Sequence, residues 1–210
     1  KGIPVGAVSS AMTRIKDENG KSWYYIRAES HSNRFLSAFY KIEDVLEVLV
    51  DTETLLPAKY TQNMRHGKYR AHEIVTYDHA NCKATYKSLT NNSEKTFDIE
   101  PQSRDGLSAL YFYRTQDIKI GESITIPVNL DEKSYTIQVK AINYQLIQIP
   151  HRGKFQTIFL SPSARFKGEP VKKGSVDLWI SLDQKRTPLM MKMKTPVGSV
   201  YAVLVKSEQK

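Results

Sequence analysis

The chain has 210 residues, of which 40% are hydrophobic and 25% charged, the composition of an ordinary globular protein with a core of its own. Its formal net charge is +9 at pH 7, but the basic residues are scattered and their densest clusters lack interleaved aromatic residues, so we expect no nucleic-acid partner. No apolar run is long enough to span a bilayer, and the single cysteine, Cys82, excludes an internal disulfide and a thiolate metal cage.

The first half of the chain predicts strands separated by turns. Residues 2–15 and 23–31 flank Asn19-Gly20, a dipeptide typical of a hairpin turn. Segment 34–41 fits either a short helical turn or an irregular strand. Further strands are predicted at 45–51, 59–65, 69–77, 82–87 and 95–99, and in the third of these Tyr69, Ala71, Glu73, Val75 and Tyr77 alternate onto one face.

Residues 105–115 predict one short amphipathic helix. Leu107, Leu110, Tyr111 and Arg114 follow the i, i+3, i+4, i+7 spacing of a helix face, which we expect to pack on a sheet. Asp105 is a good N-cap residue, although Ser103 is an alternative, and Ser108 is small enough for close approach to a sheet. Arg114 either complements the helix dipole or pairs with a buried acid.

The second half predicts strands at 123–130, 134–143, 145–150, 155–160, 175–183, 189–194 and 199–205. In total this is on the order of a dozen short strands, which indicates a mainly β fold. We expect a meandering antiparallel sheet that closes into a barrel-like or half-barrel shape. No linker rich in Pro, Gly and Ser divides residues 1–210, so we expect one domain with β-rich halves, 1–100 and 116–210, joined by the helix.

Several short motifs occur along the chain in the same order as in a known protein family. They are Val50-Asp51 with Thr54 to Pro57, Gly67 to Arg70, Asp105 to Arg114, Gly121 to Ser123, Lys133 to Tyr135, Trp179 to Pro188 and Gly198 to Val200. With this set the chain resembles the bacterial domain-of-unknown-function family 3108. The resemblance implies an exported protein of the periplasm or cell envelope of Gram-negative, Bacteroides-like bacteria. Since the sequence begins with Lys1 rather than Met, we expect that a leader has been removed. It implies no reaction and no catalytic residues, and Pro150 to Gly153 departs from the glycine turn usual in the family.

No catalytic, cofactor or metal site is predicted. Asp51, Asp105, Asp177 and Asp183 could supply the carboxylate pair of a glycoside hydrolase, but Asp51 and Asp183 also fit local roles at turns and Asp105 fits a helix start. The histidines at 66, 72 and 79 read as scattered surface residues rather than as converging metal ligands.

Aromatic residues form the candidate ligand-binding set. Several lie on strand faces opposite the clear apolar alternation, where they either line a concave ligand-binding wall or fill a second small core. The candidates are the aromatic residues Trp23, Tyr25, Tyr111, Trp179 and Tyr201, together with Arg114.

Three functions remain open. We favour a non-enzymatic binding or carrier protein for an apolar or amphipathic envelope ligand, a lipid or a glycan. The alternatives are a hydrolase that acts on an envelope glycan or lipid and a structural component of an envelope assembly. The third would expose a large apolar patch to a partner.

Overall fold

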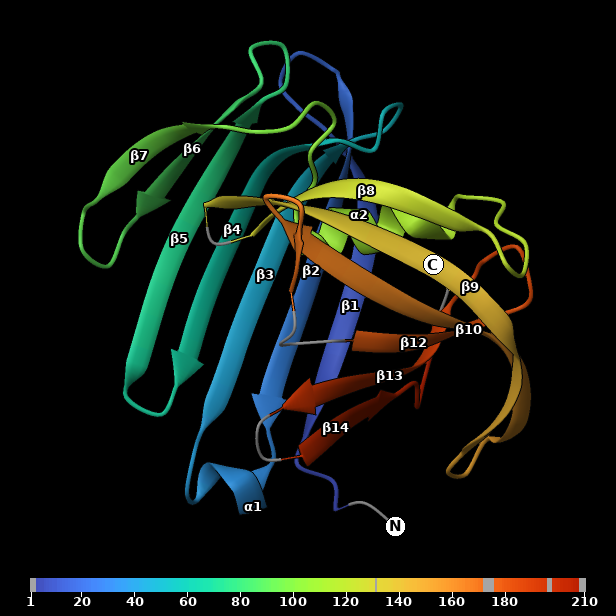
Figure 1. Ribbon diagram of the computed structural model, residues 1–210. Coiled ribbons are helices and arrows are strands. Elements are labelled where there is room, and N and C mark those ends of the chain that lie inside the picture. Colours follow the sequence, from blue (N-terminus) through green and yellow to red (C-terminus); the bar gives the residue numbers. More distant parts are fainter. Residues whose placement is uncertain (1–2, 131, 172–175, 196–197, 208–210) are drawn as a thin grey trace. The chain divides into compact units, whose positions relative to one another are not determined.

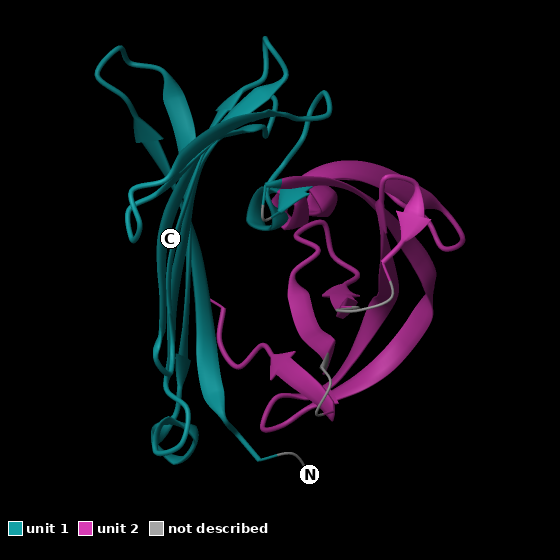
Figure 2. Cartoon of the chain, turned by 60° about the vertical axis from the view of Figure 1, so that its left-hand side comes forward, with its two compact units in different colours: residues 1–108, 129–132 teal, residues 109–128, 133–210 magenta. Residues whose placement is uncertain are grey.

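The chain divides into two compact units. The computed structural model describes residues 3–130, 132–171, 176–195 and 198–207. Unit 1 comprises residues 1–108 and 129–132, and unit 2 comprises residues 109–128 and 133–210 (Figure 2). The organisation as a single domain, expected from the sequence, stays a prediction.

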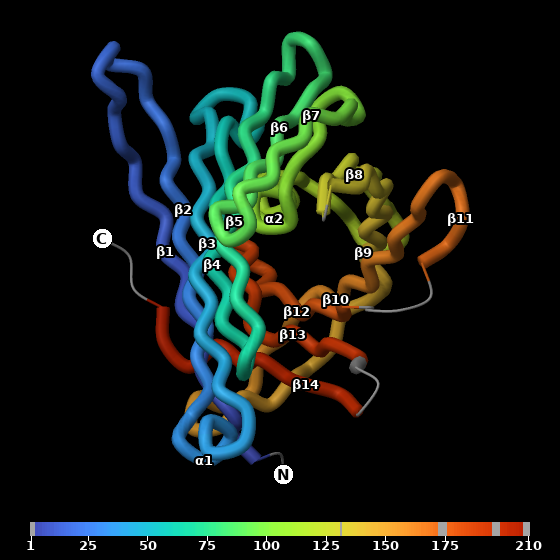
Figure 3. The backbone as a smooth tube through the Cα atoms, turned by 90° about the vertical axis from the view of Figure 1, so that its left-hand side faces the viewer, coloured from blue at the N-terminus to red at the C-terminus, as the bar shows by residue number. Residues whose placement is uncertain are grey.

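Unit 1 is built on an antiparallel sheet in which each described strand pairs with the next along the chain (Figures 1 and 3). Its strands are β1 (Gly6–Lys16), β2 (Ser22–Ser32), β3 (Ile42–Asp51), β4 (Pro57–His66), β5 (Tyr69–Asp78), β6 (Lys83–Ser88) and β7 (Glu94–Asp98). The strands predicted before the helix are therefore confirmed, with ends shifted by a few residues. Such a meander needs only short turns, because antiparallel neighbours can be joined directly.

The turn between β1 and β2 forms where Asn19-Gly20 predicts it. Gly20 has a φ of 79°, in the left-handed region that glycine adopts without steric cost. The Gly20 N–H donates to the Asp17 carbonyl oxygen at 3.0 Å. The Asp17 carboxylate accepts further bonds from the backbone N–H groups of Asn19 and Lys21, each at 2.9 Å. The predicted hairpin is confirmed.

The ambiguous segment 34–41 begins with a helical turn, α1 (Arg34–Ser37). The Asn33 side chain caps it by accepting a hydrogen bond from the Leu36 N–H at 2.9 Å. The helical alternative is therefore the right one, and the described chain has two helices rather than the single one expected.

The two faces of the unit 1 sheet differ in polarity. Side chains alternate between the faces along each strand, so register decides which residues lie together. Ile26 pairs with Val48, and both are 1% exposed. The apolar face comprises Tyr24, Ile26, Ala28, Leu46, Val48, Val50, Tyr60, Val75 and Tyr86. The opposite polar face carries charged pairs such as Arg27 beside Glu47.

Unit 2 is also an antiparallel sheet, and its strands curl strongly in Figure 2. Its strands are β8 (Ser123–Leu130), β9 (Lys133–Ile149), β10 (Gly153–Phe166), β11 (Glu169–Pro170), β12 (Val176–Ser181), β13 (Pro188–Thr195) and β14 (Gly198–Val203). The order across the sheet is β14-β13-β12-β10-β9-β8, and β11 pairs with β10. The fold is therefore mainly β and antiparallel, and neither sheet closes on itself through hydrogen bonds between described strands.

One long strand replaces two predicted ones. The prediction of separate strands at 134–143 and 145–150 is wrong, because β9 runs through both and pairs continuously with β10. The register shifts between Phe159 and Leu160, which pair with Asn143 and Ala141, so Ile142 is the extra residue of a bulge. The polar Asn143 and the irregular alternation therefore mark a bulge rather than a turn.

The helix α2 (Gly106–Arg114) forms where it is predicted but buries another face. Its most buried apolar residues are Ala109 and Tyr113, at 8% and 4% exposure, and Phe112 packs against the same core. Of the predicted stripe, Leu110 packs against this core, whereas Leu107, Tyr111 and Arg114 are not part of it, so the stripe is wrong for these three residues. The rings of Phe112 and Tyr113 bury more apolar surface than a leucine side chain would, and the small Ala109 lets the helix approach the unit 2 sheet closely.

Unit 2 has two apolar clusters on opposite sides of its sheet. Ile158 and Leu160 of β10 belong to the cluster that α2 covers. Phe155 and Phe159, at the alternate positions, belong to a second cluster with Trp179. The alternation in β10 therefore places apolar residues on both faces of this sheet.

Candidate functional site

The six candidate residues do not form one group within either unit. Trp23 and Tyr25 lie on β2 in unit 1. The other four lie in unit 2, on α2, β12 and β14. Their role in ligand binding stays a prediction, and their surroundings are as follows.

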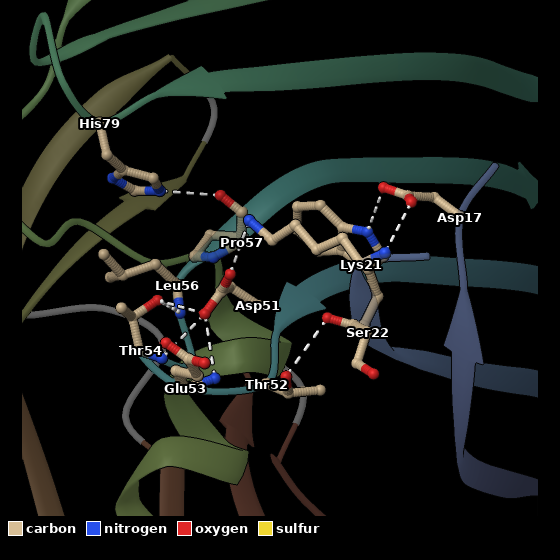
Figure 4. A network of polar contacts seen from close by, with 11 residues as sticks. Asp17, Lys21, Ser22, Asp51, Thr52, Glu53, Thr54, Leu56, Pro57 and His79 are labelled. Atoms are coloured by element: carbon tan, nitrogen blue, oxygen red, sulfur yellow. Dashed lines mark hydrogen bonds and ion pairs between the residues drawn. The ribbon is translucent and has the colours of Figure 1, made fainter. Parts of the chain in front are cut away.

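Trp23 is held by the hairpin that precedes it. Its indole N–H donates to the Asp17 carboxylate at 2.9 Å, and the Lys21 ammonium lies 4.2 Å from the centre of its ring. Lys21 also forms an ion pair with Asp51 at 2.9 Å. Figure 4 shows how Asp17, Lys21 and Asp51 lie beside the turn after β3.

Asp51 organises the turn between β3 and β4 (Figure 4). Its carboxylate accepts bonds from the backbone N–H groups of Glu53 and Thr54, each at 3.0 Å, and from the Thr54 hydroxyl at 3.1 Å. These bonds, the Thr54 N–H first, and the Lys21 ammonium hold the pKa of Asp51 well below its usual range. The predicted role of Asp51 as a strand-end turn acid is confirmed.

Tyr25 belongs to a charged network on the polar face. Its hydroxyl donates to the Glu47 carboxylate, which also accepts a bond from the Arg27 guanidinium at 2.5 Å. Arg27 bonds Glu29 as well. The hydroxyl and guanidinium groups are thus engaged with carboxylates of the same face.

Tyr111 and Arg114 contact each other on α2. The Arg114 guanidinium carbon lies 5.0 Å from the centre of the Tyr111 ring. Its Nε and Nη2 atoms donate to the Lys185 carbonyl oxygen at 3.2 and 3.1 Å. Of the expected alternatives for Arg114, pairing with a buried acid is wrong, because the partner is a backbone carbonyl group.

Trp179 fills the second core. It is 8% exposed, its ring centre lies 4.9 Å from that of Phe159, and its indole N–H donates to the Gln145 side chain at 2.7 Å. Tyr201 differs, since it is 54% exposed and lies beside Lys192 on β13. Trp179 therefore packs as core, whereas Tyr201 presents an accessible ring.

A polar strip on the apolar face is the site that sequence analysis missed. Its members are Tyr60, Gln62, Glu73 and Tyr86, all half-buried, which we call the Glu73 strip. The register places Gln62 directly opposite Glu73, and the Gln62 amide donates to the Glu73 carboxylate. The Tyr86 hydroxyl donates to the same carboxylate at 2.8 Å. The Tyr60 hydroxyl donates to the Gln62 carbonyl oxygen at 3.0 Å.

Apolar side chains border most of the strip, and the buried Ser88 pairs in register with Glu73. Tyr60 and Tyr86 share a cross-strand row with Val48 and Val75, and Gln62 follows Leu46 in the next row. Burial and the bond to Glu73 raise the pKa of Tyr86 to about 12, so this hydroxyl is a donor at neutral pH. The sequence signal was Glu73 itself, the one charged residue among the alternating residues Tyr69, Ala71, Val75 and Tyr77.

The chemistry available to the strip is recognition by hydrogen bonds. An ionised carboxylate has about four lone-pair positions, and Gln62 and Tyr86 use two of them. The remaining positions can accept bonds from a hydroxyl or ammonium group of a ligand. The strip has a single carboxylate, whereas glycoside hydrolysis needs two.

The acids considered for hydrolysis have local structural roles. Asp105 caps α2, since its carboxylate accepts bonds from the N–H groups of Leu107 and Ser108 at 2.8 and 3.0 Å. Asp177 accepts a bond from Ser161 at 3.2 Å, and Asp183 accepts one from Ser181 at 2.6 Å. With Asp51 in its turn, all four carboxylates are bonded to nearby groups.

The histidines considered as metal ligands also contact local partners. His66 pairs with Asp44 at 2.8 Å, and the His79 ring nitrogen Nε2 lies 2.8 Å from the Pro57 carbonyl oxygen (Figure 4). In the part of the chain that the structure describes, no three His, Cys, Asp or Glu side chains converge as metal ligands would. Neither described helix is long and apolar enough to cross a membrane.

These features define the class as a mainly β protein with two antiparallel sheets and one longer helix, which follows the first sheet along the chain. More specifically, the chain belongs to the family described as protein of unknown function (DUF3108), whose model matches residues 1–205. The resemblance seen in the sequence motifs is thereby confirmed. No match was found among curated proteins.

A solved structure supports the fold. The chain is similar to a beta-barrel-like protein of domain of unknown function DUF1849 from Brucella abortus, with a TM-score of 0.57 and 9% sequence identity. The match covers 95% of this chain and 98% of that chain. At this identity the likeness concerns the fold alone.

Proposed function

We propose that this protein is an exported, non-enzymatic binding or carrier protein for an amphipathic molecule of the bacterial cell envelope. The observation that carries the proposal is the Glu73 strip, a half-buried carboxylate held by Gln62 and Tyr86 beside the apolar side chains of this sheet face. An apolar face alone would suit any hydrophobic partner. An oriented carboxylate within it selects a ligand that has both an apolar part and hydrogen-bond donors.

Each part of such a ligand has a counterpart on this face. A hydrocarbon chain would lie on side chains such as Leu46 and Tyr24, with a gain of about 25 cal/mol per Å² of apolar surface removed from water. Hydroxyl or ammonium groups of the head would donate to Glu73, and a ligand acceptor would bond the second amide hydrogen of Gln62. Sugar and amine head groups of envelope lipids have this chemistry.

Location and shape belong to the same proposal. The family resemblance supports export to the periplasm or cell envelope. The likeness to a beta-barrel-like protein supports the barrel-like closure expected from the sequence. Fractionation of cells that make the full-length protein tests the location, and recovery with cytoplasmic markers would overturn it.

Native mass spectrometry of protein purified gently from the cell envelope tests the function. We expect an extra mass that organic extraction removes. Glu73→Gln keeps the size of the side chain but removes its charge, so it should reduce the ligand-bound fraction. The matched control is Glu29→Gln on the polar face, which should leave that fraction unchanged.

The outcomes separate the parts of the proposal. A wild-type protein that is always free of ligand would overturn the carrier function. A bound lipid whose occupancy is equal in the wild type and in Glu73→Gln would keep the carrier function but overturn the site.

A further inference from the structure

One end of the unit 1 sheet carries exposed aromatic rings. Helix α1 and the turn between β4 and β5 lie at this end (Figures 1 and 3). Phe35 lies in α1 and Phe39 just after it, they are 60% and 82% exposed, and their ring centres lie 6.1 Å apart. None of the four residues of α1 is buried, whereas a helix normally buries its apolar side chains. The two rings therefore form an apolar tip that faces water.

Further exposed apolar side chains adjoin this tip. Tyr40 and Tyr69 are 48% and 55% exposed, and Ile3 is 73% exposed. The backbone N–H of Asn33, the residue that caps α1, donates to the Val5 carbonyl oxygen at 2.8 Å, which brings the segment of Ile3 beside the start of the helix. We call this group the α1 surface, and its members are Ile3, Val5, Phe35, Phe39, Tyr40 and Tyr69.

Backbone hydrogen bonds hold the α1 surface together. The N–H groups of Phe39 and Tyr40 donate to the Leu36 carbonyl oxygen at 3.0 and 2.8 Å. The Gly67 N–H donates to the Lys41 carbonyl oxygen at 2.8 Å, and a Cβ atom at Gly67 would lie 2.9 Å from a Tyr40 ring carbon. Tyr40 therefore packs closely on the turn between β4 and β5, and the surface needs little ordering when it binds a partner.

Basic side chains accompany the exposed rings. Residues 33–42 and 66–70 contain no acid and four exposed basic residues, which are Arg34, Lys41, Lys68 and Arg70. Glu43, which follows the first segment, pairs with Lys41 at 2.8 Å. Asp44 pairs with His66, also at 2.8 Å. The α1 surface therefore combines aromatic rings with an excess of positive charge, and it fits a partner that combines negative charge with an apolar layer.

We propose that the α1 surface docks onto a membrane that contains anionic lipids. Phe35 and Phe39 would enter the boundary between head groups and acyl chains, where aromatic residues are favoured. The basic side chains would meet the lipid phosphates, and the chain's net charge of +9 would add a long-range attraction. A second copy of the chain would bring like charges together. An acidic protein would match the charges without offering an apolar layer to a ring as exposed as that of Phe39.

Flotation of the full chain with lipid vesicles tests this docking. Vesicles of phosphatidylglycerol and phosphatidylcholine in equal parts should carry the wild type, and the partition coefficient should be at least about tenfold lower for phosphatidylcholine alone. Binding to the anionic vesicles should weaken as salt screens the attraction. A wild type that floats with neither kind of vesicle, or equally with both, would overturn the proposal.

A variant without the exposed rings tests their insertion. Phe35→Ser together with Phe39→Ser should lower the partition coefficient by about tenfold or more, because two apolar side chains no longer leave water. The matched control is Tyr144→Ser together with Leu146→Ser, which changes two residues of unit 2 that are 64% and 61% exposed. Equal binding by these two double variants would overturn the role of the rings.

A second pair of variants separates the basic residues of this end from the net charge. Arg34→Gln together with Lys68→Gln should lower the partition coefficient by about tenfold. Lys59→Gln together with Lys154→Gln removes the same charge from exposed positions elsewhere and should have a smaller effect. Equal losses would mean attraction by net charge alone and would overturn the site. Circular dichroism would verify that all variants fold.

The docking does not depend on the ligand proposed for the Glu73 strip. Glu73→Gln should therefore bind anionic vesicles like the wild type. Loss of vesicle binding in this variant would mean that lipid uptake at the strip, rather than docking, carries the chain to the vesicles, and it would overturn the inference. Conversely, a protein that is free of ligand in native mass spectrometry can still dock, so the two proposals fail separately.

Discussion

The Tyr86 hydroxyl donates a hydrogen bond to the Glu73 carboxylate at 2.8 Å, between neighbouring strands β6 and β5. The bond runs diagonally, since Tyr86 pairs in register with Val75 and Glu73 with Ser88. Gln62 holds the same carboxylate from β4. This polar group is thus fixed from both sides, and the proposed ligand binding at the strip depends on that orientation.

The Tyr86 hydroxyl should contribute to stability. Tyr86→Phe keeps the ring but leaves Glu73 with one partner fewer, at a cost of about 1 kcal/mol at neutral pH. Because the folded pKa of Tyr86 is raised to about 12, its contribution is present below the unfolded value of about 10 and is lost as the pH rises through 12. Urea unfolding measures the free energy of unfolding of the wild type and of Tyr86→Phe at neutral and alkaline pH. The difference between the two proteins should become smaller as the pH rises, and a constant difference would contradict this dependence on the Tyr86 pKa.

Asp51 should stabilise the turn after β3. Asp51→Ala removes the acceptor for two backbone N–H groups and the partner of Lys21, and we expect a loss of about 1–3 kcal/mol at neutral pH. Its folded pKa is depressed, so this contribution is present above the usual value of 3.8 and is lost as the pH falls through the folded value.

Chemical denaturation at neutral and at acid pH measures the Asp51 effect. The control is Asp98→Ala, whose exposed ion pair with Lys83 should be worth no more than about 1 kcal/mol. Equal losses for the two variants would argue against a special role of Asp51.

Asp105 should stabilise the protein by capping α2 rather than through its charge. Asp105→Ala removes the acceptor for the Leu107 and Ser108 N–H groups and should cost about 1–2 kcal/mol, whereas Asp105→Asn keeps an acceptor and should cost less. Burial raises the pKa of the Asp105 carboxyl, so its contribution is present below about pH 4 and falls as the pH rises through the folded value.

Stability measured against pH tests the Asp105 prediction. Asp105→Asn should have a flatter profile than the wild type above about pH 4, because the variant has no carboxyl group to ionise. An equal loss in the alanine and asparagine variants at neutral pH would contradict the capping role.

Substitutions of Trp179 and Tyr201 should distinguish a role in core packing from a role in ligand binding. Trp179→Ala leaves a cavity beside Phe159 and should cost about 3–5 kcal/mol. Tyr201→Ala changes an exposed side chain and should shift stability by less than about 0.5 kcal/mol. If Tyr201 contacts the ligand, this variant should bind less of it in native mass spectrometry, and unchanged binding would remove Tyr201 from the candidates.

Much of the secondary structure follows from local sequence. The alternation from Ser123 to Leu130 predicts β8, which has these bounds, and Asn19-Gly20 predicts the first hairpin. Asp105 is predicted as the cap of α2, and it does cap the helix. Such features depend on residues a few positions apart, because turn geometry, capping and side-chain alternation act over that distance.

The candidate site depends on contacts that no local pattern reveals. Gln62, Glu73 and Tyr86 come together because β4, β5 and β6 pair in one register, and a slip of one residue would turn Glu73 to the other face. In the same way, the face that α2 buries was decided by how Phe112 and Tyr113 pack on the unit 2 sheet rather than by the spacing of Leu107 and Tyr111. The sequence by itself therefore determined where most of the strands and the helix α2 lie, whereas strand register and packing, which depend on distant residues, decided which side chains meet.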